Sequence, residues 1–120
     1  FENVVPHEQD WAIALRPEDR FIGVVGLVPG GEEAELGYWL GRPWWGRGYA
    51  TEACAALVSH AFGPLALRAL VSGCFSDNPA SAAVLRKLGF AQTGEGTLFC
   101  LAEGRELPFL QMRLERGAAR

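Results

Sequence analysis

The sequence predicts an α/β protein with a mixed, mostly antiparallel sheet and elements in the order β-β-β-α-β-α-β-β. Three observations support this prediction. Short β-branched apolar runs separated by brief turns fill the first third of the chain, and such turns can join only antiparallel strands. An amphipathic helix pattern then separates two strand-like runs, which predicts a parallel pair joined by a right-handed crossover. A second helix pattern and two final strand-like runs complete the chain.

Composition and charge bound the class of protein. The chain has 120 residues, of which 49% are hydrophobic, and this suits one domain, residues 1–120, with a buried core. Its 11 Lys and Arg residues against 14 Asp and Glu residues give a net charge of −3 without a basic block, so we expect no nucleic-acid partner. No apolar run approaches ~18 residues, so we expect no membrane partner.

Cysteine and histidine usage points to a reducing compartment. Cys54, Cys74 and Cys100 form no closely spaced pair, and the only histidines are His7 and His60. A disulfide framework or a metal site is therefore not expected, and the three cysteines are interpreted as small core residues. No signal-peptide pattern opens the sequence, so we expect a cytoplasmic location.

The expected elements of the first half are three strands joined by turns. The β-branched and aromatic runs predict strands at Trp11–Leu15, Phe21–Val28 and Ala34–Leu40. Proline and glycine place the turns at residues 16–19 and 29–31. We expect Trp11 to be a core residue.

The second half alternates helices and strands. Apolar residues at helical spacing predict a helix over Gly48–Phe62, followed by a strand at Leu70–Phe75. Asn78 before a proline is a good start for a second helix. The residues expected on the inward face of this helix are Ser81, Val84, Leu85 and Leu88. The last two strands are expected at Thr97–Ala102 and Leu107–Leu114.

The most informative segment is residues 36–52, where a strand runs through a glycine-bearing turn into a helix. Gly46 and Gly48 lack a Cβ atom, so a bulky anion could approach the backbone amides at the helix N-terminus, and Arg47 adds a cation. This pattern favours a phosphate or pyrophosphate site. Alternatively, the glycines only make a tight turn. The P-loop and Rossmann glycine patterns are both absent.

Two motifs in the same order resemble a known family. Trp45-Gly-Arg-Gly-Tyr-Ala50 precedes Asn78-Pro-Ala-Ser81 and Leu85-Arg-Lys-Leu-Gly-Phe90, and over roughly residues 11–115 the sequence resembles the GNAT superfamily of N-acetyltransferases. Gly37-Tyr-Trp-Leu40 resembles the branch that includes ribosomal-protein N-terminal acetyltransferases. The resemblance implies that the bound anion is the pyrophosphate of the cosubstrate acetyl-CoA.

The resemblance also implies which residues bind acetyl-CoA. The pantetheine arm is expected between two splayed strands, Glu35–Leu40 and Leu70–Phe75, with the amide near Trp39 or Leu40 polarising the thioester carbonyl. Asn78 either caps the second helix or hydrogen-bonds to pantetheine. Backbone groups of the glycine turn are expected to hold the pyrophosphate: Gly46, Arg47, Gly48, Tyr49, Ala50 and Thr51. Trp45 stands where the family has Gln or Arg, so no side-chain contact to the cosubstrate is carried over to that position.

The expected catalytic residues are Ser81 and Glu35. Many family members protonate the departing thiolate with a tyrosine, but Leu85 occupies that position here, and the resembled branch uses the serine that corresponds to Ser81. Alternatively, Ser81 only satisfies backbone amides of its helix. Glu35 could accept the amine proton directly or through water, or it could be a solvated charge. Glu103 and Glu106 are alternative candidates for the general base. An amine that enters the site unprotonated needs no strong base.

The expected reaction is direct attack by a primary amine on acetyl-CoA. The acceptor is expected to be a protein N-terminus, followed by a small-molecule amine. The alternatives are a non-catalytic acyl-CoA-binding or regulatory module and an interaction domain without a cosubstrate. Family members usually carry a strand and two helices before the strand at Trp11, so we expect an N-terminal truncation relative to the family. The resemblance also makes a homodimer an expectation.

Overall fold

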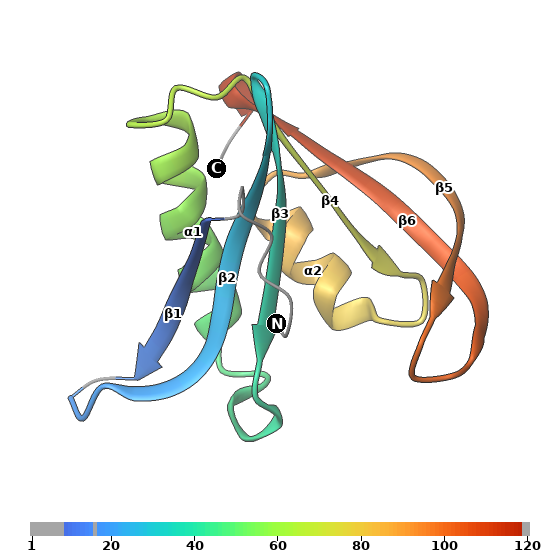
Figure 1. Cartoon of the computed structure of the whole chain (residues 1–120), viewed down its shortest axis with the longest axis horizontal. Coiled ribbons are helices and arrows are strands. Elements are labelled where there is room, and N and C mark those ends of the chain that lie inside the picture. Colours follow the sequence, from blue (N-terminus) through green and yellow to red (C-terminus); the bar gives the residue numbers. More distant parts are fainter. Residues whose placement is uncertain (1–8, 16, 119–120) are drawn as a thin grey trace.

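The computed structural model of the chain describes residues 9–15 and 17–118, which form one six-stranded sheet and two α-helices (Figure 1). The strands and α-helices, in chain order, are β1 (Gln9–Leu15), β2 (Arg20–Gly30), β3 (Glu33–Leu40), α1 (Tyr49–Phe62), β4 (Ala69–Phe75), α2 (Pro79–Lys87), β5 (Ala91–Cys100) and β6 (Arg105–Glu115). Short 3₁₀ turns lie at Arg42–Trp44 and Arg116–Ala118. The predicted order of strands and α-helices is confirmed.

The sheet is mixed, as predicted. Its strand order is β1-β2-β3-β4-β6-β5. Strands β3 and β4 are parallel, and all other neighbours are antiparallel. The single parallel pair is the one joined through α1, because a tight turn cannot connect two parallel strands.

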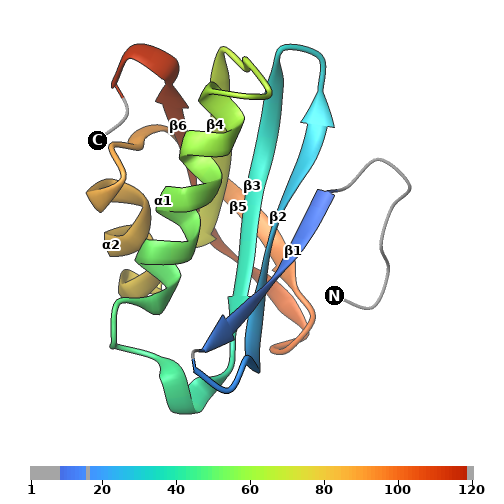
Figure 2. The same ribbon diagram turned by 90° about the vertical axis from the view of Figure 1, so that its left-hand side faces the viewer.

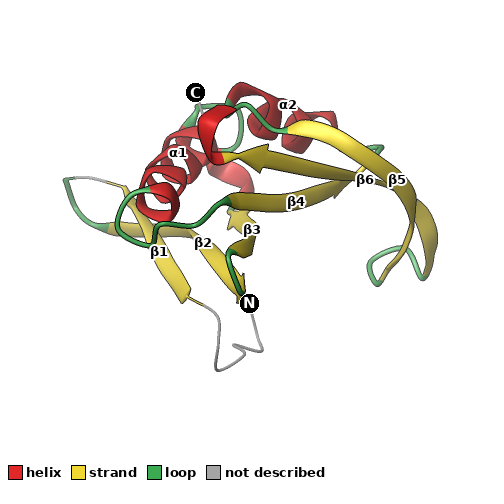
Figure 3. Cartoon of the chain, turned by 90° about the horizontal axis from the view of Figure 1, so that it is seen from above, coloured by secondary structure: helices red, strands yellow, loops and turns green. Residues whose placement is uncertain are grey.

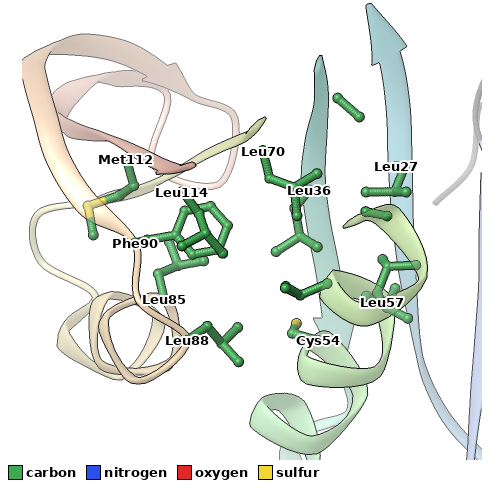
Figure 4. Close-up of a cluster of buried hydrophobic side chains, with 14 residues drawn as sticks. Leu27, Leu36, Cys54, Leu57, Leu70, Leu85, Leu88, Phe90, Met112 and Leu114 are labelled. Atoms are coloured by element: carbon green, nitrogen blue, oxygen red, sulfur yellow. The ribbon is translucent and has the colours of Figure 1, made fainter. Parts of the chain in front are cut away.

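Both helices cover the same face of the sheet (Figures 2 and 3). Helix α1 buries Cys54, Leu57, Val58 and Ala61 at helical spacing, which confirms the predicted apolar stripe. Side chains from both helices and from the sheet meet in one core (Figure 4). The cluster comprises Val25, Leu27, Ala34, Leu36, Cys54, Leu57, Val58, Ala61, Leu70, Leu85, Leu88, Phe90, Met112 and Leu114.

The inward face of α2 differs in part from the prediction. Leu85 and Leu88 are buried as expected, but Ala82 joins them, while Ser81 and Val84 are only half-buried. The helix is therefore rotated by a fraction of a turn relative to the predicted stripe. This rotation leaves Ser81 and Val84 at the margin of the core, where they can face a cleft.

The fifth strand begins earlier than predicted, at Ala91 instead of Thr97, and ends at Cys100. It is an edge strand that pairs with β6 along its length, and most of its residues are exposed, so no burial alternation marks it in the sequence. A register shift between Gln92 and Gly94 further obscures the pattern. The turn that joins β5 to β6 lies at residues 101–104.

Trp11 was predicted to be in the core, but its side chain is 37% exposed and makes an edge-to-face contact with His60 at 5.5 Å between ring centroids. The position on edge strand β1 explains this exposure, because only one neighbouring strand covers it. In the predicted turn at 16–19, residues 17–19 form a turn and Arg16 lies outside the described residues.

The described cysteines are free thiols. Cys54 and Cys74 are buried, and burial raises the pKa of the Cys54 thiol to about 12. A thiol with so high a pKa is a poor nucleophile at neutral pH, and the burial of Cys54 and Cys74 confirms their interpretation as core residues. The interpretation is wrong for Cys100, which is only half-buried at the end of edge strand β5. None of the described helices combines the length and the apolar character needed to cross a bilayer.

Candidate active site

Strands β3 and β4 run side by side for only three residue pairs and then diverge (Figure 1). The pairs are Glu33–Ala69, Ala34–Leu70 and Glu35–Val71. On their outer edges, β2 pairs with β3 as far as Leu40, and β6 pairs with β4 as far as Phe75. Residues 36–40 and 72–75 therefore present facing backbone edges without a ladder between them, which confirms the predicted splay.

Hydrogen-bond alternation shows which groups of β3 face this opening. The amide of Gly41 bonds to the carbonyl of Ile22 at 2.8 Å, so odd-numbered residues of β3 direct their backbone groups toward β2. Even-numbered residues direct theirs toward β4. Of the two amides considered as donors to a thioester, that of Leu40 faces the opening, whereas that of Trp39 faces β2.

A serine side chain closes the narrow end of the opening. The hydroxyl of Ser72 on β4 donates a 2.8 Å hydrogen bond to the carbonyl oxygen of Leu36, the first carbonyl beyond the paired region. Behind it, Gly73 lies against the ring of Phe109, so closely that a Cβ atom there would collide with the ring. The contact between Gly73 and Phe109 packs β4 on β6, while the bond of Ser72 ties β4 to β3 where their ladder ends.

A cleft of about 280 Å³ lies at the wide end of the opening. It is bordered by β3, by the turn before α1 and by the first turns of both helices. Its lining residues are Tyr38, Trp39, Leu40, Trp45, Gly46, Ala50, Asn78, Ala80, Ser81 and Val84. The cleft thus brings together six of the predicted site residues: Trp39, Leu40, Gly46, Ala50, Asn78 and Ser81.

The turn before α1 has the backbone shape expected of an anion site. Gly46 and Gly48 have φ values of +74° and +82°, and no atom lies within 4 Å of where their Cβ atoms would be. Gly48 contributes no side-chain cap, and the helix's first backbone bond runs from the amide of Glu52 to the carbonyl of Gly48 at 3.0 Å. The preceding amides, at residues 49–51, are those that a helix cannot satisfy itself.

The start of α2 is capped instead. The side-chain oxygen of Asn78 accepts a 3.2 Å hydrogen bond from the amide of Ser81, which confirms the predicted cap. The hydroxyl of Ser81 is therefore not needed for capping. It accepts a 3.2 Å hydrogen bond from the phenol of Tyr38 across the cleft.

Tyr38 was not among the predicted site residues. Burial raises the pKa of its phenol above the ordinary value of 10.0, although the hydrogen bond to Ser81 acts in the opposite direction. The phenol is thus protonated at neutral pH and can donate. The strand alternation of Ala34, Leu36 and Tyr38 on the helix-covered face is the signal that could have found it.

Other predicted residues lie outside this cleft. Glu35 is exposed, in the paired part of β3 and roughly 17 Å along the strand from Leu40. Arg47 is exposed in the turn, and Thr51 is half-buried in α1. Tyr49 lines a different cavity. Arg47, Tyr49 and Thr51 lie at or just before the start of α1 but do not line the cleft, so only their backbone groups are compatible with the predicted pyrophosphate site.

The alternative bases also lie away from the cleft lining. Glu103 is paired with Arg105 at 2.8 Å in the β5–β6 turn, and Glu106 is exposed at the start of β6. Leu85, at the position of the family tyrosine, is fully buried in the core. No described residue other than Tyr38 brings a phenol to this cleft.

The cavity that Tyr49 lines is larger, about 650 Å³, and lies between β1, β2 and α1. Its lining is mostly aliphatic and aromatic, and Glu52 and His60 are the members that can carry a charge at or near neutral pH. It does not include residues of the open β3 and β4 edges. We therefore place the candidate site in the smaller cleft, where free backbone groups and a helix start converge.

Two tryptophans shape the turn. Trp44 packs over Gly41, where a Cβ atom would lie 3.0 Å from its ring. Trp45 is 58% exposed and lines the cleft, with the guanidinium of Arg42 over its ring at 5.3 Å. Within the described residues, no group of three or more His, Cys, Asp and Glu side chains could hold a metal ion.

The family model described as "Acetyltransferase (GNAT) domain" matches residues 3–91. The ribosomal-protein-serine acetyltransferase of Escherichia coli is 35% identical over 97 residues, which cover 77% of this chain and 54% of the relative. YoaA of Bacillus subtilis, an uncharacterized N-acetyltransferase, is 34% identical over 87 residues, which cover 70% of this chain and 49% of YoaA. The chain spans about half the length of these relatives.

Solved structures share the fold. The ribosomal-protein-S5-alanine acetyltransferase of Vibrio fischeri aligns with a TM-score of 0.85 at 19% identity, covering 95% of this chain and 64% of that chain. A mutant of the spermidine N-acetyltransferase from Vibrio cholerae aligns with a TM-score of 0.83 at 18% identity, covering 93% of this chain and 68% of that chain. At these identities the likeness shows the architecture alone.

Proposed function

Since the chain belongs to the GNAT acetyltransferase family, we propose that it transfers an acetyl group from acetyl-CoA to a primary amine. One observation carries the proposal: the end of the open β3 edge, where β3 has diverged from β4, meets the uncapped start of α1 and the first turns of α2 in a single cleft. Backbone groups for an extended polar chain and amides for an anion thus lie side by side.

The cleft fits the chemistry of acetyl-CoA. The amides at the start of α1 suit a pyrophosphate, because a helix N-terminus carries partial positive charge, and Arg47 in the same turn adds a full charge. The even-numbered residues of β3 offer backbone groups to an amide-bearing pantetheine arm. The amide of Leu40 is the proposed donor to the thioester carbonyl, since it faces the opening.

Ser81 is the proposed proton donor. In the reaction the amine nitrogen bonds to the carbonyl carbon, the C–S bond breaks, and its electron pair goes to sulfur. The hydroxyl of Ser81 supplies a proton to that sulfur, and the amine proton released to water in the open cleft restores the hydroxyl. Positioned proton donors contribute about 10²- to 10⁴-fold to rate.

A side-chain base is not required in this proposal. The exposed position of Glu35, outside the cleft lining, does not support direct proton abstraction. A role for Glu35 through water stays a prediction. An amine that enters as the free base loses its proton to solvent after attack.

The proposed acceptor is a protein N-terminal amine, followed by a small polyamine. The first choice has support from the Escherichia coli relative, which is named for a ribosomal protein. The second has support only from a fold likeness to a spermidine enzyme. A homodimer stays a prediction.

Calorimetric titration of the chain with acetyl-CoA, CoA and adenosine 3′,5′-bisphosphate tests the site. We expect micromolar binding of the first two and weaker binding of the third. Thiol release with a serine-initiated peptide, an alanine-initiated peptide and spermidine then tests turnover. Absence of acetyl-CoA binding by the folded chain contradicts the proposal. Binding without thiol release from any amine supports the non-catalytic acyl-CoA-binding alternative.

A further inference from the structure

The hydroxyl of Ser81 has an unusual set of partners for a residue in the first turn of a helix. Such a serine commonly satisfies backbone amides, but Asn78 already accepts from the amide of Ser81 at 3.2 Å. Instead, the oxygen of Ser81 accepts from the phenol of Tyr38 at 3.2 Å. A serine hydroxyl has two acceptor positions and one hydrogen. With Tyr38 bound to the oxygen, that hydrogen is available to the cleft.

We propose that Tyr38 is a positioning residue for acetyl transfer, which acts by holding the Ser81 hydroxyl as a donor directed into the cleft. The inference rests on the proposed function, in which Ser81 protonates the departing sulfur. Tyr38 gives up no proton in this role. The phenol is the more acidic of the two hydroxyls and hence the better donor, so the pair favours donation from Tyr38 to Ser81, and this leaves the serine hydrogen for the thiolate.

The surroundings of Tyr38 suit a fixed donor. Tyr38 lies opposite Val25 of the neighbouring strand β2, and its half-buried ring packs against the core cluster. The ring is therefore held from the strand side, while Ser81 is held by its capped helix. The two residues lie 43 positions apart, so the bond joins β3 to α2 across the cleft.

A purely structural tie between strand and helix is the competing explanation. Loss of such a tie would loosen the cleft, and it would weaken acetyl-CoA binding and fold stability along with turnover. Loss of a positioning contact lowers kcat while the affinity for acetyl-CoA is unchanged. The two explanations also differ in whether the effect of Tyr38 depends on the Ser81 hydroxyl.

The first test is a double-mutant cycle with Tyr38→Phe and Ser81→Ala, using the amine that gives thiol release. Tyr38→Phe keeps the ring and removes only the hydroxyl. We expect a roughly three- to tenfold loss of kcat for Tyr38→Phe, about a hundredfold loss for Ser81→Ala, and no further loss in the double variant. Ser59→Ala, an exposed serine on α1, is the control. Independent losses that multiply in the double variant overturn the inference.

The second test does not depend on turnover. The pKa of the thiol of bound CoA is measured from the ultraviolet absorbance of its thiolate in wild type and in the same variants. A hydrogen bond from Ser81 stabilises the thiolate and lowers that pKa, so Tyr38→Phe should raise it toward the Ser81→Ala value. Equal values in wild type and Tyr38→Phe overturn the inference.

The two tests separate this inference from the proposed function. If no amine is acetylated but the thiol pKa depends on Tyr38 and Ser81 as described, the proposed function fails and the positioning role of Tyr38 is supported. If amines are acetylated but neither readout responds to Tyr38→Phe, only the positioning role fails. If CoA does not bind, both are overturned.

Discussion

The indole nitrogen of Trp45 donates a 2.7 Å hydrogen bond to the carbonyl oxygen of Leu40, the last residue of β3. This carbonyl faces the open side of the strand, as does that of Leu36, which accepts from Ser72 at 2.8 Å. Side chains thus satisfy the carbonyls at both ends of the open edge. Trp45, which replaces the Gln or Arg of the resembled family at this position, ties the proposed anion-binding turn to the strand.

We expect Trp45→Phe to weaken acetyl-CoA binding about fivefold. The variant keeps an aromatic ring but removes the N–H donor, and one hydrogen bond contributes roughly 1 kcal/mol. Calorimetric titration measures the change. Trp11→Phe, in the cavity on the other side of α1, is the matched control and should bind like wild type. Unchanged affinity in Trp45→Phe would show that the turn does not depend on this bond.

Gly48→Ala should weaken acetyl-CoA binding and also lower the free energy of unfolding. At a φ of +82° a residue with a Cβ atom costs roughly 1–2 kcal/mol, and relaxation of that strain moves the amides at the start of α1. Gly48→Trp should abolish binding, because its side chain also occupies the space in front of those amides. Titration calorimetry and urea denaturation measure the two effects.

Gly31→Ala separates strain from binding. Gly31 has a φ of +73° in the β2–β3 turn, with open space around its Cβ position, and it does not line the cleft. We expect the same order of destabilisation as for Gly48→Ala and wild-type affinity for acetyl-CoA. If Gly48→Ala binds acetyl-CoA as Gly31→Ala does, the start of α1 is not the pyrophosphate site.

The order of elements was predictable because it rests on local signals. The stripe of α1, the Asn78 cap and the apolar strands β2 to β4 are each legible within one short stretch of sequence. Strand β5 was placed too late, because an exposed edge strand with a register shift at Gln92 has no burial period and takes its conformation from its pairing with β6. Tertiary pairing overrides local preference there.

The site was predictable only in part, for the same reason. Glycines before a helix mark the proposed anion-binding turn in the sequence itself, and the structure places them at positive φ before an uncapped helix start. The bond between Tyr38 and Ser81 joins residues 43 positions apart, and it depends on the angle at which α2 crosses the splayed strands. The alternation of β3 places Tyr38 on the helix side, but no local pattern identifies its partner.

Glu33 should make the stability of the fold depend on acidic pH. Its carboxylate accepts a 2.6 Å hydrogen bond from Arg113, and this bond lowers the pKa of Glu33 below 4.5. A lowered folded-state pKa contributes stability above the unfolded pKa, and that contribution is lost as pH falls through the folded pKa. The pair is partly exposed, so we expect a small effect.

The measurement compares urea midpoints of wild type and Glu33→Gln at pH 7 and at pH 3. Wild type should be more stable at pH 7, and the difference should shrink at pH 3. Glu18→Gln is the control, because Glu18 and Arg20 lie 3.8 Å apart and are both largely exposed. A difference that is constant between the two pH values would contradict the role assigned to the ionised Glu33.

Leu85→Tyr tests whether the tyrosine that many family members carry on this helix could be restored. Leu85 is fully buried and does not line the cleft, so a tyrosine there would enlarge a packed side chain and bury a hydroxyl in the core. Overpacking costs about 1–3 kcal/mol, and an unpaired hydroxyl adds to that cost. We expect a lower urea midpoint and no recovery of turnover when Leu85→Tyr is combined with Ser81→Ala.

Val84→Thr, at a residue that lines the cleft, is the control and should keep the urea midpoint closer to that of wild type. Recovery of thiol release in the combined variant would show that position 85 reaches the reacting sulfur, and the proton donor would then be sought on that turn of α2.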